Sequence, residues 1–178
     1  RYTAAEAQAT RRAAQELRSG EALLLNFEHI GASELAAGNI RQALNTYRSL
    51  GSRHPKEALH RIRLASALLQ VGLGEQARDE IKEAIRLEPQ SALAHRTLGW
   101  ILQHDLIGRR FKKGFDLRGS VAAYRRSKEL DPKDTLVRAD LAILLEHNEL
   151  GERYASNADL EAAIAEYRQL RDMDEESR

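Results

Sequence analysis

The most informative stretch of this sequence is residues 58–91, which read ALHRIRLASALLQVGLGEQARDEIKEAIRLEPQS. Small and apolar residues recur in it at helical spacing on both sides of Gly72, and Pro89 closes it. Apolar residues spaced by three and four predict amphipathic helices, and a glycine between two such segments predicts a tight turn. The stretch therefore predicts a hairpin of two helices.

The same pattern recurs along the chain. Pro55 and Pro89 lie 34 residues apart, and Pro132 falls at the same phase of the repeat. Small residues mark the points where paired helices would cross closely: Gly31, Ala65, Gly99 and Ala142 on the first helices, and Ala43, Ala77, Ser120 and Ala163 on the second. Self-similarity with a period of roughly 20 to 50 residues is typical of stacked supersecondary units. We predict an all-α array in which each hairpin buries its apolar face against its neighbours.

The pattern places a leading helix at 3–19 and four hairpins after it. We expect the first helices near 22–37, 57–71, 91–105 and 134–147, and the second helices near 39–53, 74–87, 117–130 and 159–172. The whole of 1–178 is then one array, with repeat 1 at 24–57, repeat 2 at 58–91, extended repeat 3 at 92–134 and extended repeat 4 at 135–178. Glycines at 38 and 72 suit the left-handed residue that ends each first helix.

The small and large positions resemble the tetratricopeptide repeat family over roughly residues 22–174, most closely in 58–91. The resemblance implies a right-handed α-α superhelix whose first helices line a concave surface for peptides or partner helices. Glu34 stands where the family usually has an aromatic residue, and Glu175 replaces the final proline. We therefore expect the first and last units to be the looser ones.

The third and fourth hairpins share an extension of about nine residues between their helices, and residues 98–131 align with 141–174 at a constant offset of 43. We predict a glycine turn in each extension, an aromatic residue (Phe111 or Tyr154) tucked back onto its hairpin, and an arginine–aspartate pair that closes the loop. The aspartates at 116 and 159 also suit helix N-caps, where a carboxylate accepts hydrogen bonds from free backbone N–H groups.

We find no sequence pattern for catalysis. The chain has no cysteine, which removes disulfides, thiolate zinc sites and cysteine nucleophiles, and it has no glycine-rich phosphate loop. His104 and His147 are the strongest candidates for a metal or acid–base site because they recur at matching positions. A metal site would need further ligands, with Asp105 and Glu146 nearest, so we favour a hydrogen bond that closes the loop. We predict a protein that is not an enzyme and needs no cofactor or metal.

Charge and hydropathy give no sign of nucleic acid or membrane as a partner. The net charge is +1, and no apolar run approaches the roughly 20 residues that span a bilayer. The basic cluster at 109–113, RRFKK, becomes ERYAS at 152–156, so we interpret it as a solvated loop, with contact to an acidic partner as the alternative. We expect a soluble protein, cytoplasmic or periplasmic, whose compartment the sequence does not identify.

The concave surface is the candidate binding site, since the family resemblance places the first helices there. The predicted partner-binding residues are Leu59, Ile62, Leu69, Leu93, Arg96, Trp100, Gln103, Leu136 and Ile143. The positions that clamp a terminal carboxylate in some family members hold Glu28, Ala32, Arg63, Leu93 and Thr97, which does not support that activity. A large apolar patch usually meets a partner. We predict a scaffold that binds a segment or helix of another protein, unless the loops, the leading helix or a second copy of the chain fill the groove.

Two alternatives to this function stay open. The segment from His104 to Phe111 resembles repeat segments of larger bacterial multidomain proteins, so the chain could be the non-catalytic arm of an enzyme or envelope protein. A scaffold that self-associates is the other alternative.

Overall fold

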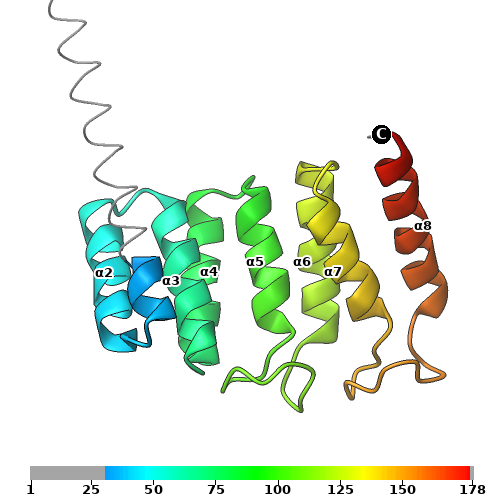
Figure 1. Cartoon of the computed structure of the whole chain (residues 1–178), viewed down its shortest axis with the longest axis horizontal. Coiled ribbons are helices and arrows are strands. Elements are labelled where there is room, and N and C mark those ends of the chain that lie inside the picture. Colours follow the sequence, from blue (N-terminus) through cyan, green and yellow to red (C-terminus); the bar gives the residue numbers. More distant parts are fainter. Residues whose placement is uncertain (1–30, 177–178) are drawn as a thin grey trace, which may run out of the picture. The chain divides into compact units, whose positions relative to one another are not determined.

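The computed structural model describes residues 31–176, and every regular element in that range is a helix (Figure 1). The chain divides into two units, one that ends at Arg53 and one that starts at His54. The predicted leading helix at 3–19 and the start of repeat 1 lie outside the described residues. The predicted class, an all-α array of helical hairpins, is confirmed.

The first unit contains a helical segment at 31–36 and helix α2 (Ile40–Arg53). Gly38 connects them with a φ of +80°, as predicted for a left-handed turn residue. A β-carbon on Gly31 would lie 2.9 Å from Cζ of Tyr47. The two segments therefore cross at a residue that has no room for a side chain, which explains the small residue at this position.

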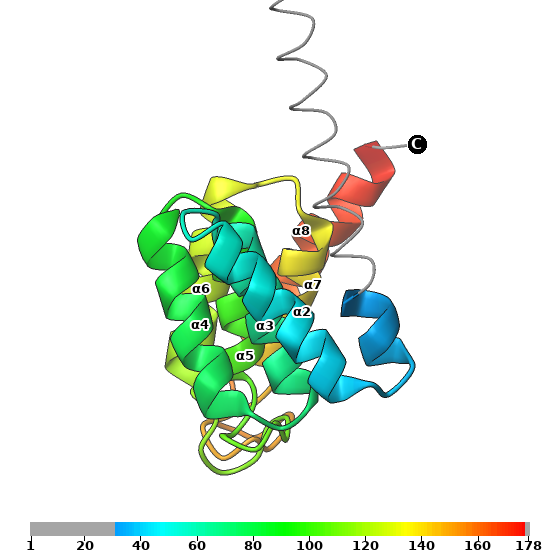
Figure 2. The ribbon, with the colours of Figure 1, turned by 90° about the vertical axis from the view of Figure 1, so that its left-hand side faces the viewer.

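The second unit contains three hairpins in chain order. They pair α3 (Ala58–Gln70) with α4 (Gly74–Leu87), α5 (Ala92–Leu102) with α6 (Leu117–Leu130), and α7 (Thr135–Leu145) with α8 (Leu160–Glu176). Helix α4 also packs on α5, and α6 packs on α7, so each hairpin stacks on the next. Figure 2 shows the two long loops of the last two hairpins on the same side of this unit.

Small residues set the close packing within the third hairpin. The Ser120 hydroxyl donates to the carbonyl of Gly99 at 2.7 Å, and a β-carbon on Gly99 would lie 2.9 Å from the ring of Tyr124. Tyr124 itself is fully buried and packs in a cluster with Val137 and Leu141 of the next hairpin. The predicted roles of these positions, one small pair for the crossing and one large residue toward the next repeat, are confirmed.

The first helices of the two extended hairpins end earlier than predicted, at Leu102 and Leu145 instead of 105 and 147. Loop residues take the acceptors at the end of α5: the Asp116 N–H donates to the carbonyl of Leu102 at 2.8 Å, and the Phe111 N–H donates to that of Gln103 at 2.9 Å. Helix α8 extends beyond the predicted residue 172 to Glu176. The N-caps are as predicted, since Asp116 accepts from Gly119 N–H and Asp159 from Ala162 N–H.

Within residues 31–176, no helix combines the length and the apolar character that crossing a bilayer demands.

Candidate functional site

Three first helices of the second unit meet at a hollow of about 240 Å³. The hollow is lined by Ser66 of α3, by Arg96, Thr97 and Trp100 of α5, and by Leu136 and Asp140 of α7. The first helices are those that the sequence placed on the concave surface. Each of three successive repeats thus contributes a wall to one site.

Trp100 is the large aromatic residue of this hollow, and its side chain is 37% exposed. The Arg110 guanidinium lies 4.7 Å from the centre of the indole ring, a cation–π distance, and the His104 ring lies 5.1 Å from it. Leu136 across the hollow is 61% exposed. The indole is therefore held by neighbours from the loop while an apolar residue faces it from the next repeat.

A chain of buried and partly buried polar groups lies next to the hollow. The Arg110 Nε donates to Oε1 of Gln103, and the Gln103 Nε2 donates to the hydroxyl of Tyr124, both at 2.8 Å. Tyr124 in turn hydrogen-bonds Asp140. Burial raises the pKa of Tyr124 and, against the opposing charges of Arg110 and Arg96, also raises the pKa of Asp140. The network joins the loop of repeat 3 to the wall of repeat 4.

Arg96 stands at the rim of the hollow and is paired across the repeat boundary. Its Nη1 donates to Oδ2 of Asp134 at 3.0 Å, and both side chains are partly exposed. Asp134 also caps α7, since its Oδ1 accepts from the N–H groups of Leu136 and Val137. The ion pair therefore orients Arg96 with respect to α7, and a guanidinium has further N–H donors for a carboxylate or carbonyl.

The structure brings together some of the predicted groove residues and not others. Arg96, Trp100 and Leu136 line the hollow, Leu59 is exposed on α3, and Leu93 and Ile143 are partly buried. The prediction that Ile62, Leu69 and Gln103 face an open groove is wrong, because all three are buried. Gln103 belongs to the polar network beneath Trp100, and the loop of repeat 3 packs against the end of α3, where Gly108 meets the carbonyl of Leu69.

Sequence reasoning missed Asp140, which lines the hollow beside Leu136. The signal was its helical spacing: residue 140 follows 136 by four positions and is the counterpart of Thr97 at the offset of 43. Both of these counterparts line the same hollow. The role of Asp140 was not predicted because its partner, Tyr124, lies in a different repeat, and the spacing within one helix does not reveal such a pair.

The two long loops have nearly the same internal structure. An isolated backbone bridge joins His104 to Arg110 in the first and His147 to Arg153 in the second. The Nδ1 atoms of the two histidines donate to the carbonyls of Trp100 and Ile143, each at 2.8 Å. The histidine side chains thus bind the ends of α5 and α7, while backbone atoms close the loops, so the predicted loop-closing side-chain bond is wrong. Across residues 31–176, no three His, Cys, Asp or Glu side chains gather as a metal site.

Each loop turns around a buried side chain that accepts two backbone hydrogen bonds. Asp105 accepts from the N–H groups of Ile107 and Arg109, and Asn148 accepts from those of Leu150 and Glu152. The second polar atom of each side chain bonds to a charged side chain of the same loop. Arg109 donates to Oδ2 of Asp105, and Nδ2 of Asn148 donates to Oε2 of Glu152, both at 2.7 Å. The loop of repeat 3 thus pairs a central carboxylate with a cation, and the loop of repeat 4 pairs a central amide with a carboxylate.

In the loops, the hydroxyl of Tyr154 donates to Oε1 of Glu146 in its own hairpin, as predicted, whereas Phe111 and the arginines do not take their predicted partners. Phe111 stacks on His147 of the next loop, with ring centres 3.8 Å apart, instead of folding back onto its own hairpin. Arg110 bonds Gln103, and the Arg153 Nε donates to Glu146 at 2.7 Å, so the predicted pairs with the capping aspartates are wrong. Because Arg109 also binds Asp105, two residues of the basic cluster serve the loop itself.

The loop histidines predict a pH dependence of stability. The pKa values of His104 and His147 are lowered, in both cases mainly because burial disfavours the imidazolium. Since the folded-state pKa lies below the unfolded value of about 6.5, this contribution is present above that pH and is lost as the pH falls through the folded-state value. We expect the urea midpoint to decrease between about pH 7.5 and pH 5.5.

The double variant His104→Gln, His147→Gln isolates this effect, because other groups, such as Asp140 with its raised pKa, remain in it. The drop in urea midpoint should be smaller in the double variant than in the wild type. An equal drop in both proteins would show that these histidines do not carry the dependence.

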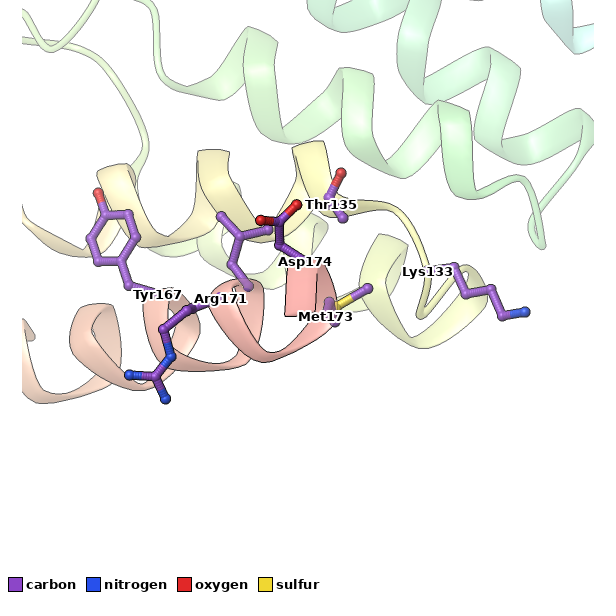
Figure 3. A pocket seen from close by; sticks show the side chains of 7 residues that line it. Lys133, Thr135, Tyr167, Arg171, Met173 and Asp174 are labelled. Atoms are coloured by element: carbon purple, nitrogen blue, oxygen red, sulfur yellow. The ribbon is translucent and has the colours of Figure 1, made fainter. Parts of the chain in front are cut away.

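A second, larger hollow of about 920 Å³ lies between α7 and α8 (Figure 3). Figure 3 shows Tyr167 at one end of it and Lys133 at the other. Leu170 in its wall stands where the two preceding repeats have Ala84 and Ser127. The Ser127 hydroxyl donates to the carbonyl of Ala92 at 2.8 Å and ties α6 to the start of α5. Leucine is larger and has no hydroxyl, which explains why the last hairpin is open at this end.

Comparison with known proteins identifies the repeat. The model of the tetratricopeptide repeat family matches residues 34–101, which include the 58–91 stretch. No curated protein matches the chain.

Several solved structures share the fold. A crystal structure of MamA covers 99% of this chain and 98% of its own, with a TM-score of 0.65 at 14% identity. MamA 41-end from Desulfovibrio magneticus RS-1 covers 86% and 76%, with a TM-score of 0.63 at 14% identity. A mutant of the Thermobaculum terrenum O-GlcNAc transferase covers 84% of this chain but only 26% of the transferase, with a TM-score of 0.63 at 16% identity. At these identities the likeness establishes the fold.

Proposed function

Because this chain carries tetratricopeptide repeats, we propose that it is a non-catalytic scaffold that binds a segment of another protein in the groove of its first helices. The observation that carries the proposal is the position of Trp100. A large indole, partly exposed, lies in a hollow to which three successive repeats contribute. Aromatic residues in such hollows commonly supply most of the binding energy of an interface.

The chemistry of the hollow suggests what the partner presents. Trp100 and Leu136 form an apolar seat for one aliphatic or aromatic side chain. Arg96 offers N–H donors at the rim, and the carboxylate of Asp140 lies beside it. We expect the partner to place an apolar anchor between the two walls and a carboxylate or backbone carbonyl toward Arg96. The polar network next to Trp100 would preorganise the side chains of the hollow for binding.

Trp100 is the only tryptophan of the chain, so its fluorescence reports directly on the groove. Partners would first be captured with the wild-type protein, and a peptide from the captured segment would then be titrated while the emission of Trp100 is recorded. We expect a shift of the emission to shorter wavelength as the indole loses contact with water. Leu93→Glu should weaken binding in this titration by at least about tenfold. Trp100→Ala leaves the chain without tryptophan, so its loss of binding, of similar size, is measured by partner capture.

A matched surface variant separates groove binding from other effects. Leu150→Asp changes an exposed residue on the loop of repeat 4, outside the groove, and should leave partner capture and the tryptophan shift unchanged. Circular dichroism would establish that all three variants are folded. Partner binding that survives both groove variants would place the site elsewhere and contradict the proposal. The alternatives of a repeat arm in a larger bacterial protein and of a self-associating scaffold stay predictions.

A further inference from the structure

The side chain of Arg78 connects α4 to the loop of repeat 3. Its Nη2 donates to the carbonyl oxygen of His104 at 2.8 Å and to that of Gly114 at 3.1 Å. The start of α4 also meets this loop, since the Gly74 N–H donates to the carbonyl of Leu106 at 3.0 Å. One guanidinium therefore joins the two ends of the loop to the preceding repeat.

Helix α6 occupies the corresponding place in repeat 3 but has neither of these residues. The two helices have the same length and begin at Gly74 and Leu117, so Val121 corresponds to Arg78. A β-carbon on Gly74 would lie 2.6 Å from the carbonyl oxygen of Asp105. A leucine at this position therefore keeps the loop of repeat 4 farther from α6, and the valine offers it no hydrogen-bond donor.

The loop of repeat 4 keeps the two acceptors. Because both loops have the same backbone bridge at the offset of 43, the carbonyls of His147 and Asn157 correspond to those of His104 and Gly114. Among residues 31–176, no donor forms a hydrogen bond with either of these two carbonyls. The acceptor pair that holds Arg78 at one repeat boundary thus recurs at the next, where the described chain supplies no donor.

A pocket of about 510 Å³ lies between α6 and the loop of repeat 4. The two replaced residues, Leu117 and Val121, line it together with Leu145 at the end of α7, and Asn157 lines it from the loop. Its walls are therefore apolar along the helices and polar at the loop. Such a pocket suits a ligand with an apolar chain and a polar head that donates hydrogen bonds.

We propose that this pocket binds a guanidinium group on an alkyl chain, in the place that the Arg78 side chain has at the preceding boundary. The head would donate to the carbonyls of His147 and Asn157, and the chain would lie along Leu117 and Val121. A planar guanidinium presents several N–H donors in a fixed geometry, whereas an ammonium is a compact and strongly hydrated charge. The proposal does not depend on the groove function proposed above.

The charged residues that line the pocket balance one another in number. Glu149 and Asp159 line it from the loop, and Arg118 and Arg125 line it from α6. The Arg118 Nε donates to Oε1 of Glu149 at 2.7 Å, and the Arg118 side chain is 87% exposed, so it points to solvent. Arg125 lies about two helical turns from Leu117, away from the loop end. The two carbonyls therefore decide that the loop end of the pocket takes a donor.

An NMR titration of the full chain tests the proposal. Agmatine presents the guanidinium on a free alkyl chain, and N-acetylarginine methylamide presents it as a peptide would. We expect a guanidinium probe to shift the amide signals of the residues that line the pocket, with a dissociation constant of about 1 mM. The matched ammonium compounds, cadaverine and N-acetyllysine methylamide, should bind at least about tenfold more weakly.

Variants of the protein locate the site. Val121→Arg restores the residue of the preceding boundary, so its own side chain should occupy the pocket and abolish binding. The matched control is Ile107→Arg, which adds the same charge at a residue 60% exposed on the loop of repeat 3 and should bind like the wild type. Arg125→Gln removes a like charge at an exposed position and should strengthen binding a few-fold, which also serves as the test if circular dichroism shows that Val121→Arg is unfolded.

The outcomes separate the source of the guanidinium from the failure of the proposal. Binding of N-acetylarginine methylamide would support an arginine side chain as the source, and binding of agmatine alone would support a free compound. No shift with either probe, equal affinity for the ammonium compounds, or binding retained by folded Val121→Arg would overturn the proposal. A loss of binding in Arg125→Gln would also overturn it, since the occupant would then be an anion.

Discussion

Replacing Gly151 by alanine is expected to lower the free energy of unfolding by about 3 kcal/mol. Gly151 has a φ of +78°, where an L side chain is strained, and its β-carbon would lie 2.3 Å from the carbonyl oxygen of Phe111. That oxygen belongs to the backbone of the neighbouring loop, so it cannot move away as a flexible side chain would. The strain costs about 1 kcal/mol and the forced separation of the two loops adds the rest.

Other glycines with nearly the same φ provide a graded control. Gly38 and Gly72 both have a φ of +80°, but a β-carbon on Gly38 would meet nothing within 4 Å, and one on Gly72 would lie 3.2 Å from the carbonyl oxygen of Ile107. Urea unfolding followed by circular dichroism should therefore give a small loss for Gly38→Ala, a larger one for Gly72→Ala and the largest for Gly151→Ala. Equal losses at the three positions would mean that the loops are not in close contact.

The helices were predictable because their cause is local. Proline, glycine and the spacing of small residues lie within one hairpin, and they placed α4 and α6 at their observed bounds. The ends of α5 and α7 were not predictable in this way. Apolar residues continue through Leu106 and Ile107 at helical spacing, whereas the helix stops at Leu102 because Asp116 and Phe111, distant in sequence, take its carbonyls.

The candidate site was predictable to the extent that it follows one helix face. Trp100, Arg96 and Leu136 lie where repeat spacing places them, since each projects from a first helix. Gln103 follows the same spacing but is buried, because the loop places Arg110 over it and Tyr124 beneath it. The partner of a polar side chain depends on the path of a loop, and no periodicity in the sequence describes that path.

The pairing of side chains in the loops could not be predicted from the repeat either. The repeat of arginine and aspartate at the offset of 43 favoured a pair between Arg110 and Asp116, yet both are engaged elsewhere. The stacking of Phe111 on His147 joins two different repeats. The recurrence of these residues was a correct sign that the loops have one structure, although it did not identify which atoms meet.

Exchanging the charge at the centre of the second loop tests that shared structure. Asn148→Asp should lower the free energy of unfolding by about 2 kcal/mol. The Asn148 side chain is buried and its Nδ2 donates to Glu152 at 2.7 Å and to Asn157 at 3.0 Å. A carboxylate there would still accept the N–H groups of Leu150 and Glu152, but it would face the carboxylate of Glu152 in place of a donor.

The first loop has an aspartate at the position of Asn148 and an arginine at the position of Glu152. There the Arg109 side chain donates to Asp105, so the charge of the carboxylate is balanced. Adding Glu152→Arg to Asn148→Asp should therefore recover most of the lost stability, whereas Glu152→Arg alone should not stabilise the protein, because Asn148 then presents a donor to a cation. A double-mutant cycle from urea unfolding measures this coupling, and we expect about 1 to 2 kcal/mol. Additive losses in the two single variants and the double variant would show that the matching geometry of the loops does not extend to their energetics.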